Sequence, residues 1–302
     1  MVTLPNGVTL NNLIEDLKSF SWESADILLN YSEKIKDFRV KHEFLKSVNQ
    51  NNPVTEADLK VNEVLIKNIR KKYSEIDWDI LSEENVKIDS SFSDFNSDWL
   101  WVLDPLDGTK DFIQGTGNYA MHLALNYKQK AFIGVVLIPE KDELWISDGE
   151  TTWYERRDKS FKKTQLFSKN ILQEMVLVTS KNHRNETLKK LIEKIKFKEV
   201  IIMGSIGCKI ASILRGESDI YISLSLPGQS SPKDWDFAAP EAILKAAGGA
   251  ITDLNNQELC YGEPNYQKGG IILASNNRHT HKNLCSQVKE IISKYDIYPL
   301  ED

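Results

Sequence analysis

The sequence predicts a layered protein of mixed α and β structure, with an α+β lobe followed by an α/β lobe. Three observations support this fold class. Apolar residues recur at helical spacing over 10–33 and 56–72. Short strand-like runs separated by polar turns follow over 119–156, as in an antiparallel meander. From about residue 170, strand-like runs alternate with helical patterns, which is typical of α/β structure.

The first lobe is expected to span residues 1–168. Its two helical segments place Leu13 and Leu17, and then Val61 and Leu65, on one face of each helix. Runs rich in apolar, β-branched and aromatic residues predict the strands that follow: 99–103, 119–126, 131–138, 143–147 and 152–156. We therefore expect an antiparallel sheet covered by helices.

The second lobe is expected to span residues 169–302. The predicted strands are 176–180, 200–204, 219–223, 250–253 and 271–275. The predicted helices are 186–196, 206–215, 237–247 and 280–293. Because ligands collect at strand ends in layered folds, we expect a cleft where strand ends of the two lobes meet.

Composition excludes several classes of protein. The chain has 302 residues, of which 41% are hydrophobic and 27% charged, the balance of a globular protein. Its net charge of -6 and lack of a basic stripe argue against nucleic-acid binding. It shows neither a signal peptide at its N-terminus nor an apolar run long enough for a membrane span. Three cysteines without metal-ligand spacing suit a reducing cytoplasm.

The stretch WLWVLDPLDGTKDF, from Trp99 to Phe112, ends a predicted strand in a cluster of carboxylates. Asp104 lies at the strand end, Pro105 is expected to stop the strand, and Gly108 permits a turn with positive φ. Asp107 can then face the same space as Asp104. Two close carboxylates suit a hard cation, although an Asx-turn would use the same residues, and the residues alone leave both interpretations open.

Two further acidic pairs strengthen the cation hypothesis. Glu83 and Glu84 follow an apolar run, and Asp234 and Asp236 precede a predicted helix. Alone, the glutamates are also consistent with a solvated loop, and Asp236 with the N-cap of helix 237–247. Pro240 would then lie in the first turn of that helix. The neighbouring Trp235 indicates partial burial, which a cap does not require.

The ordered motifs L-S-E-E, W-V-L-D-P-L-D-G-T-K-D-F and W-D-F-A-A-P-E-A-I-L-K-A-A-G-G resemble the inositol monophosphatase superfamily from about residue 50 to 276. The resemblance implies a layered αβαβα sandwich and a Mg²⁺-dependent, lithium-sensitive phosphomonoesterase with two or three metal ions. It implies that five residues bind them: Glu83, Asp104, the Leu106 carbonyl, Asp107 and Asp236. Two such ions activate water and neutralise the phosphoryl group in an in-line displacement.

The resemblance also implies a catalytic pair. Thr109 would orient the attacking water and pass its own proton to the aspartate of an upstream V-T-x-x-D, which reads PVTEADL here and supplies Asp58. The same residues form a capping box, with Thr55 as N-cap and Asp58 at N3. Both roles are compatible, because a helix start would hold Asp58 in place.

Lys110 directs the choice of substrate. D-P-L-D-G-T-K-[DE]-F is most similar to the 3′(2′),5′-bisphosphate nucleotidases, which hydrolyse adenosine 3′,5′-bisphosphate to AMP and phosphate in sulfur metabolism. The 5′-phosphosulfate relative is a second candidate substrate, and an inositol or sugar phosphatase is the alternative function. Lys110 argues against that alternative, whereas the altered spacing described below weakly favours it.

A second phosphate needs additional cationic or amide contacts. We expect these contacts from segments 180–186 and 203–209 and from the turn around Gly108. The candidate residues in the two segments are His183, Arg184, Gly204, Ser205 and Lys209. Related nucleotidases often read G-S-S-x-K, whereas Ser205 and Lys209 are four residues apart here. Ser205 is equally consistent with a plain helix cap, and Arg184 with a solvated charge. Homodimers are frequent in the superfamily, but the sequence shows no interface signal.

Overall fold

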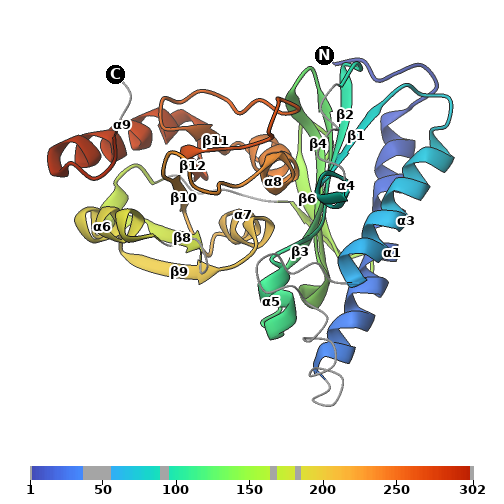
Figure 1. Ribbon diagram of the computed structural model, residues 1–302, viewed down its shortest axis with the longest axis horizontal. Coiled ribbons are helices and arrows are strands. Elements are labelled where there is room, and N and C mark those ends of the chain that lie inside the picture. Colours follow the sequence, from blue (N-terminus) through green and yellow to red (C-terminus); the bar gives the residue numbers. More distant parts are fainter. Residues whose placement is uncertain (1, 37–55, 89–94, 164–168, 181–184, 300–302) are drawn as a thin grey trace.

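The computed structural model describes residues 2–36, 56–88, 95–163, 169–180 and 185–299. Figure 1 shows five layers, in the order helices, sheet, helices, sheet, helices. This arrangement confirms the predicted αβαβα sandwich of mixed α and β structure. Among the described residues, no helix has both the length and the apolar character needed to cross a membrane.

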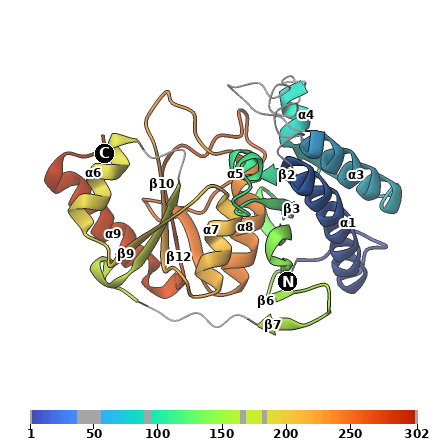
Figure 2. The ribbon, with the colours of Figure 1, turned by 90° about the horizontal axis from the view of Figure 1, so that it is seen from below.

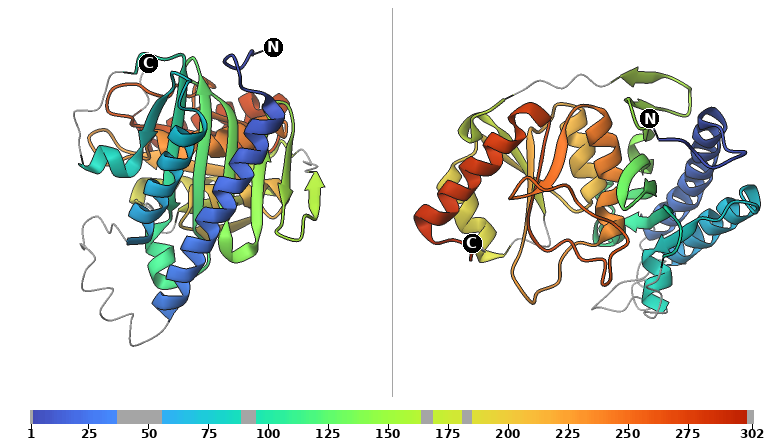
Figure 3. Two further views of the ribbon diagram at one scale, coloured as in Figure 1. Left: turned by 90° about the vertical axis from the view of Figure 1, so that its right-hand side faces the viewer. Right: turned by 90° about the horizontal axis from the view of Figure 1, so that it is seen from above.

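The first two layers are α1 (Leu10–Lys36) and α3 (Glu56–Lys72) against a seven-stranded sheet. Its strands lie in chain order: β1 (Asp79–Ser82), β2 (Trp99–Asp107), β3 (Ala120–Tyr127), β4 (Lys130–Ile138), β5 (Glu143–Ser147), β6 (Thr152–Glu155) and β7 (Phe161–Lys163). β1 pairs with β2 in parallel, and the later strands form the predicted antiparallel meander. Figure 3 shows α1 and α3 running across one face of this sheet.

Two helices, α7 (Ile206–Leu214) and α8 (Asp234–Ala246), form the central layer. Figure 2 shows them between the two sheets. They contact β3 and β4 on one side, while α7 contacts β8 and α8 contacts β11 on the other. One apolar core therefore joins residues of both halves of the chain.

The last two layers are a five-stranded sheet and its outer helices, α6 (Glu186–Ile195) and α9 (Arg278–Tyr295). The strand order is β11 (Ala250–Asp253), β12 (Gly270–Ser275), β10 (Ile220–Ser225), β8 (Val176–Ser180) and β9 (Glu199–Met203). β8 pairs in parallel with β9 and β10, as expected from the strand–helix alternation. The boundary expected between residues 168 and 169 falls between the last strand of the first sheet and the first strand of the second.

Two short helices, α4 (Glu83–Ile88) and α5 (Thr109–Gln114), connect strands beside the cleft described below. α4 replaces the loop that was one interpretation of Glu83 and Glu84. Short 3₁₀ turns at Pro139–Lys141 and Leu172–Glu174 complete the described elements.

Candidate active site

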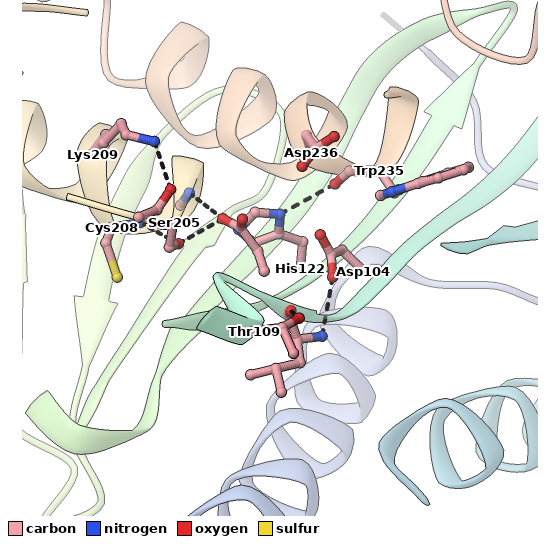
Figure 4. A network of polar contacts seen from close by, with 12 residues as sticks. Asp104, Thr109, His122, Ser205, Cys208, Lys209, Trp235 and Asp236 are labelled. Atoms are coloured by element: carbon pink, nitrogen blue, oxygen red, sulfur yellow. Dashed lines mark hydrogen bonds and ion pairs between the residues drawn. The ribbon is translucent and has the colours of Figure 1, made fainter. Parts of the chain in front are cut away.

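A polar cleft of about 1070 Å³ lies between the two halves of the chain. It is lined by the ends of β2 and β10 and by the starts of α4, α5, α7 and α8. Many of the residues singled out from the sequence line it: Glu83, Asp104, Leu106, Asp107, Gly108, Thr109, Lys110, Gly204, Lys209 and Asp236. Figure 4 shows the network of polar contacts that connects several of them.

A β-bulge brings Asp104 and Asp107 to one side of β2. Asp104 pairs with His122 and Asp107 with Ala120, so three steps along β2 match two along β3. In a regular strand, side chains three residues apart would face opposite sides of the sheet, and the extra residue corrects this. The expectation that Pro105 stops the strand was wrong: pairing resumes at Asp107, because a bulge accommodates a residue without an N–H donor.

Asp104, Asp107 and Asp236 each place a carboxylate oxygen within 4.8 Å of those of the other two. Burial raises the pKa of Asp104 well above its usual range, and repulsion from Glu83, Asp107 and Asp236 adds to that effect. Burial, with repulsion from Asp107, raises the pKa of Asp236 to about 7. The cluster therefore carries negative charge that a cation would stabilise.

Asp107 is the anchored member of this cluster. Its Oδ2 accepts hydrogen bonds from Ser205 Oγ at 2.6 Å and from the Gly207 amide at 3.0 Å, and it lies 3.2 Å from His122 Nε2. Burial would raise the pKa of Asp107, but the His122 imidazole, Lys209 and Ser205 outweigh burial and lower it. Among the contacts of the described residues, all three use Oδ2, so Oδ1 is the oxygen that can turn toward a ligand.

His122 is a site residue that the sequence reasoning missed. Its Nδ1 lies 3.2 Å from the Trp235 carbonyl, and its Nε2 faces Asp107. The ring therefore lies between two hydrogen-bond acceptors, one on α8 and one on β2. A Cβ at Gly207 would lie 2.2 Å from Nε2, so glycine allows this approach of α7 to β3. His122 thus links α8 to Asp107 from the buried side of the cluster.

The structure corrects the predicted start of α8. The helix begins at Asp234, with Lys233 as N-cap, so Asp236 lies at N3 and its Oδ2 accepts from the Lys233 amide at 2.6 Å. The interpretation of Asp236 as an N-cap was therefore wrong, and Pro240 lies beyond the first turn. The helix therefore starts three residues earlier than periodicity indicated, and its first residue, Asp234, is fully buried and forms an ion pair with Lys268.

Glu83 lies at the start of α4, outside the group of three aspartates defined by the 4.8 Å limit. Its Oε1 is 2.9 Å from Lys87 Nζ, and its charge still raises the pKa of Asp104. Glu84 is buried and pairs with the same ammonium group at 2.6 Å. Glu83 therefore borders the aspartate cluster, while its own negative charge is balanced by a lysine.

Thr109 and Asp58 both lie near the cluster. The Thr109 hydroxyl donates to the Leu106 carbonyl at 3.1 Å. Asp58 is buried in the first turn of α3, and its repulsion contributes to the raised pKa of Asp104. A hydroxyl has one proton, so a relay to Asp58 requires the Thr109 hydroxyl to rotate. That relay stays a prediction, and Thr55 of the expected capping box lies outside the described residues.

The polar groups at the start of α7 bind the aspartate cluster, which leaves them unavailable to a substrate phosphate. Ser205 is the N-cap, accepting from the Cys208 amide, while its hydroxyl and the Gly207 amide bind Asp107. These donors are thereby already occupied. Lys209 is completely buried, donates to the Gly204 carbonyl at 2.7 Å and lies over the Tyr221 ring. Burial lowers the pKa of Lys209 to about 8, so it is an ammonium group at neutral pH.

The remaining predicted residues lie at the margin of the cleft or outside the described residues. Gly108 has the predicted positive φ of 89° and begins α5. Lys110 is exposed at the cleft opening. His183 and Arg184 lie outside the described residues, so their predicted contact with substrate stays a prediction.

The residues at the cleft floor fit a divalent cation. Hard cations prefer carboxylate oxygen ligands, and three such oxygens converge here. The raised pKa values of Asp104 and Asp236 show that their charges are only partly balanced by the protein. The cleft around them is large and polar, as a charged small-molecule substrate requires.

Comparison with known proteins identifies the class. The profile of the inositol monophosphatase family matches residues 13–293. Fold, carboxylate cluster and this match together define a phosphatase that depends on metal ions. The chain belongs to the inositol monophosphatase family.

Two curated relatives and one solved structure illustrate the similarity. The chain is 33% identical over 211 residues to the 3′(2′),5′-bisphosphate nucleotidase CysQ of Buchnera aphidicola, covering 70% of this chain and 75% of that one. It is 27% identical to the protein of the same name from Aggregatibacter actinomycetemcomitans, covering 87% and 94%. An inositol monophosphatase from Anabaena shares the fold, with a TM-score of 0.67, 21% identity and coverage of 93% and 96%.

Proposed function

We propose that this protein is a Mg²⁺-dependent phosphomonoesterase that hydrolyses the 3′-phosphate of adenosine 3′,5′-bisphosphate to give AMP and phosphate. The observation that carries this proposal is the convergence of Asp104, Asp107 and Asp236 at the floor of a polar cleft. The nucleotidase names of the curated relatives support the choice of substrate. The 5′-phosphosulfate relative of this substrate is included in the proposal.

In the proposed mechanism, the three aspartates, Glu83 and the Leu106 carbonyl would hold two or three cations. When bound, these cations lower the pKa of water and neutralise the phosphoryl group. The protein itself anchors Asp107 through Ser205, Gly207 and His122, so that its carboxylate keeps one orientation. Such preorganisation fixes the position of the reacting phosphate.

Three side chains would then orient the water and attract the substrate. The Thr109 hydroxyl, at the start of α5, orients the attacking water when its own proton turns from Leu106 toward Asp58. The Lys209 ammonium lines the cleft and attracts the anionic substrate. Lys110, at the cleft opening, adds a second positive charge at the entrance.

Phosphate release from three substrates tests this proposal: adenosine 3′,5′-bisphosphate, adenosine 3′-monophosphate and inositol 1-phosphate, each with Mg²⁺. We expect the largest kcat/KM for the bisphosphate. Faster hydrolysis of inositol 1-phosphate would instead favour an inositol phosphatase. No phosphate release from any of them would refute the proposed activity.

The Lys209→Ala variant asks which phosphate this ammonium contacts. A charge-assisted hydrogen bond contributes about 1.5–3 kcal/mol, so its loss should raise KM about 10- to 100-fold. If Lys209 contacts the 5′-phosphate, only the bisphosphate is affected and adenosine 3′-monophosphate is the internal control. Equal losses on both nucleotides would assign Lys209 to the reacting phosphate, which they share.

A further inference from the structure

Lys87 makes two ion pairs at the edge of the cleft. Its ammonium lies 2.9 Å from Glu83 Oε1 and 2.6 Å from Glu84 Oε1. The helix α4 produces this arrangement, because residues three and four positions apart lie on one face. Lys87 and Glu83 are each about one-fifth exposed, at 22% and 21%, whereas Glu84 is only 1% exposed. The Lys87 ammonium is therefore held between one buried carboxylate and one that faces the cleft.

The Glu83 carboxylate lies close enough to the aspartate cluster to repel it, yet it forms an ion pair with Lys87. Repulsion from Glu83 raises the pKa of Asp104, so the two carboxylates feel each other. Both Glu83 and Lys87 line the cleft. Attraction by Glu83 and Glu84 outweighs burial and raises the pKa of Lys87 above its usual value, so this lysine stays charged throughout the neutral range. A cation that approaches Glu83 must therefore compete with the Lys87 ammonium group, which is already paired with the Glu83 carboxylate.

We propose that Lys87 is a tethered competitor for divalent cations at Glu83, and that it thereby sets how tightly the cleft binds metal. The proposal rests on the proposed function, since it presumes a cation site at the three aspartates. When a cation takes Glu83, the lysine keeps its shorter contact with buried Glu84, so only one of the two ion pairs is exchanged. Lys87 thus lowers the affinity at Glu83 without leaving the site.

Titration of the chelator-treated protein with Mn²⁺, followed by calorimetry without substrate, tests the proposal. Lys87→Met should bind Mn²⁺ about tenfold more tightly than the unmutated protein, since the cation then no longer displaces the ion pair with Glu83, and a difference of about 1.4 kcal/mol corresponds to that factor. Lys87→Arg, which keeps the charge, should stay within about twofold. An affinity of Lys87→Met equal to or weaker than that of the unmutated protein would overturn the proposal.

Lys18→Met is a matched control. Lys18 on α1 is 20% exposed and also bridges two glutamates, Glu15 at 2.9 Å and Glu155 at 2.8 Å. Its removal changes the net charge equally but lies outside the cleft, so Mn²⁺ affinity should not change. An increase in Lys18→Met as large as that in Lys87→Met would mean that overall charge alone is responsible, and would also overturn the proposal.

A second pair of variants guards against misfolding, because Lys87→Met leaves the buried Glu84 without its partner. Glu84→Gln combined with Lys87→Met should bind Mn²⁺ about tenfold more tightly than Glu84→Gln alone. Equal affinities in this pair overturn the proposal even where the single lysine variant does not fold. If the unmutated protein binds no Mn²⁺, the proposed function itself fails, whereas Mn²⁺ binding that Lys87 does not affect overturns only this inference.

Discussion

Replacing Asp236 by asparagine should stabilise the protein when metal ions have been removed. Burial, with repulsion from Asp107, raises the pKa of Asp236 in the folded protein to about 7, against 3.8 for an unperturbed aspartate. An acid whose pKa is raised by folding destabilises the folded state as pH rises, because folding then opposes its ionisation. The cost begins near pH 4, grows up to about pH 7 and stays constant above it. Asparagine avoids this cost and can still accept from the Lys233 amide.

The magnitude follows from the size of the shift. About three pKa units at about 1.4 kcal/mol each give an upper value of about 4 kcal/mol at pH 8. Asp236 is partly exposed and shares its repulsion with Asp107, so we expect about 2–4 kcal/mol. For a chain of 302 residues, that corresponds to a rise in Tm of roughly 3–6 °C. Near pH 4 the two proteins should unfold at the same temperature.

Thermal unfolding with a chelator, measured from pH 4 to 8, provides the assay. Asp98→Asn is a suitable control, because this aspartate is 60% exposed and its contact with Lys128 is 3.6 Å long. In excess Mg²⁺ the order should reverse, since the unmutated protein gains stability from a ligand that the variant binds weakly. A Tm difference that does not depend on pH would refute the electrostatic explanation of the cluster.

Two other predictions concern the catalytic pair and a buried acid. Thr109→Ala and Asp58→Asn should each lower kcat about 10²- to 10⁴-fold with little change in KM. The double variant should be little worse than either single variant, because the two residues act as a unit. Losses of kcat that multiply would instead leave Asp58 a structural role only. Burial raises the pKa of Glu241 to about 7 although Tyr261 donates a hydrogen bond to it. Glu241→Gln should therefore gain stability relative to the unmutated protein as pH rises from 5 to 8, measured by urea unfolding; a constant difference would contradict this.

The fold was largely predictable because its signals are local. Periodicity places most helices and strands within a few residues of their observed ends, whereas the αβαβα layering was implied by the resemblance to the inositol monophosphatase superfamily. The start of α8 was misplaced because Asp236 lies at N3 and accepts from the Lys233 amide, and in the sequence an aspartate at N3 resembles one at the N-cap. The ion pair of Asp234 with Lys268, a partner more than thirty residues away, has no local signal. The passage of β2 through Pro105 likewise depends on pairing with β3.

The carboxylates of the candidate site could be predicted from the sequence. The residues that hold these carboxylates in position could not. Motif spacing indicates Asp104, Asp107 and Asp236, but nothing local shows that Ser205 and His122 meet Asp107. One signal was present: a histidine in the otherwise apolar run YAMHLAL, with alanines two residues away on either side. Those alanines face the central helices, where a buried histidine needs hydrogen-bond partners.

The bulge in β2 has a consequence for how the motif tolerates changes in length. A regular strand keeps two side chains on one face only when an odd number of residues separates them, and here the number is even. Deleting Leu106 would leave one residue between the aspartates, so a strand without the bulge could also keep both on the cleft side. Substituting any residue within the strand leaves this parity intact, whereas a change in length by one residue keeps both carboxylates on the cleft side only if the bulge is lost at the same time. Across relatives, the spacing between the two aspartates should therefore vary far less than the side chains that lie between them.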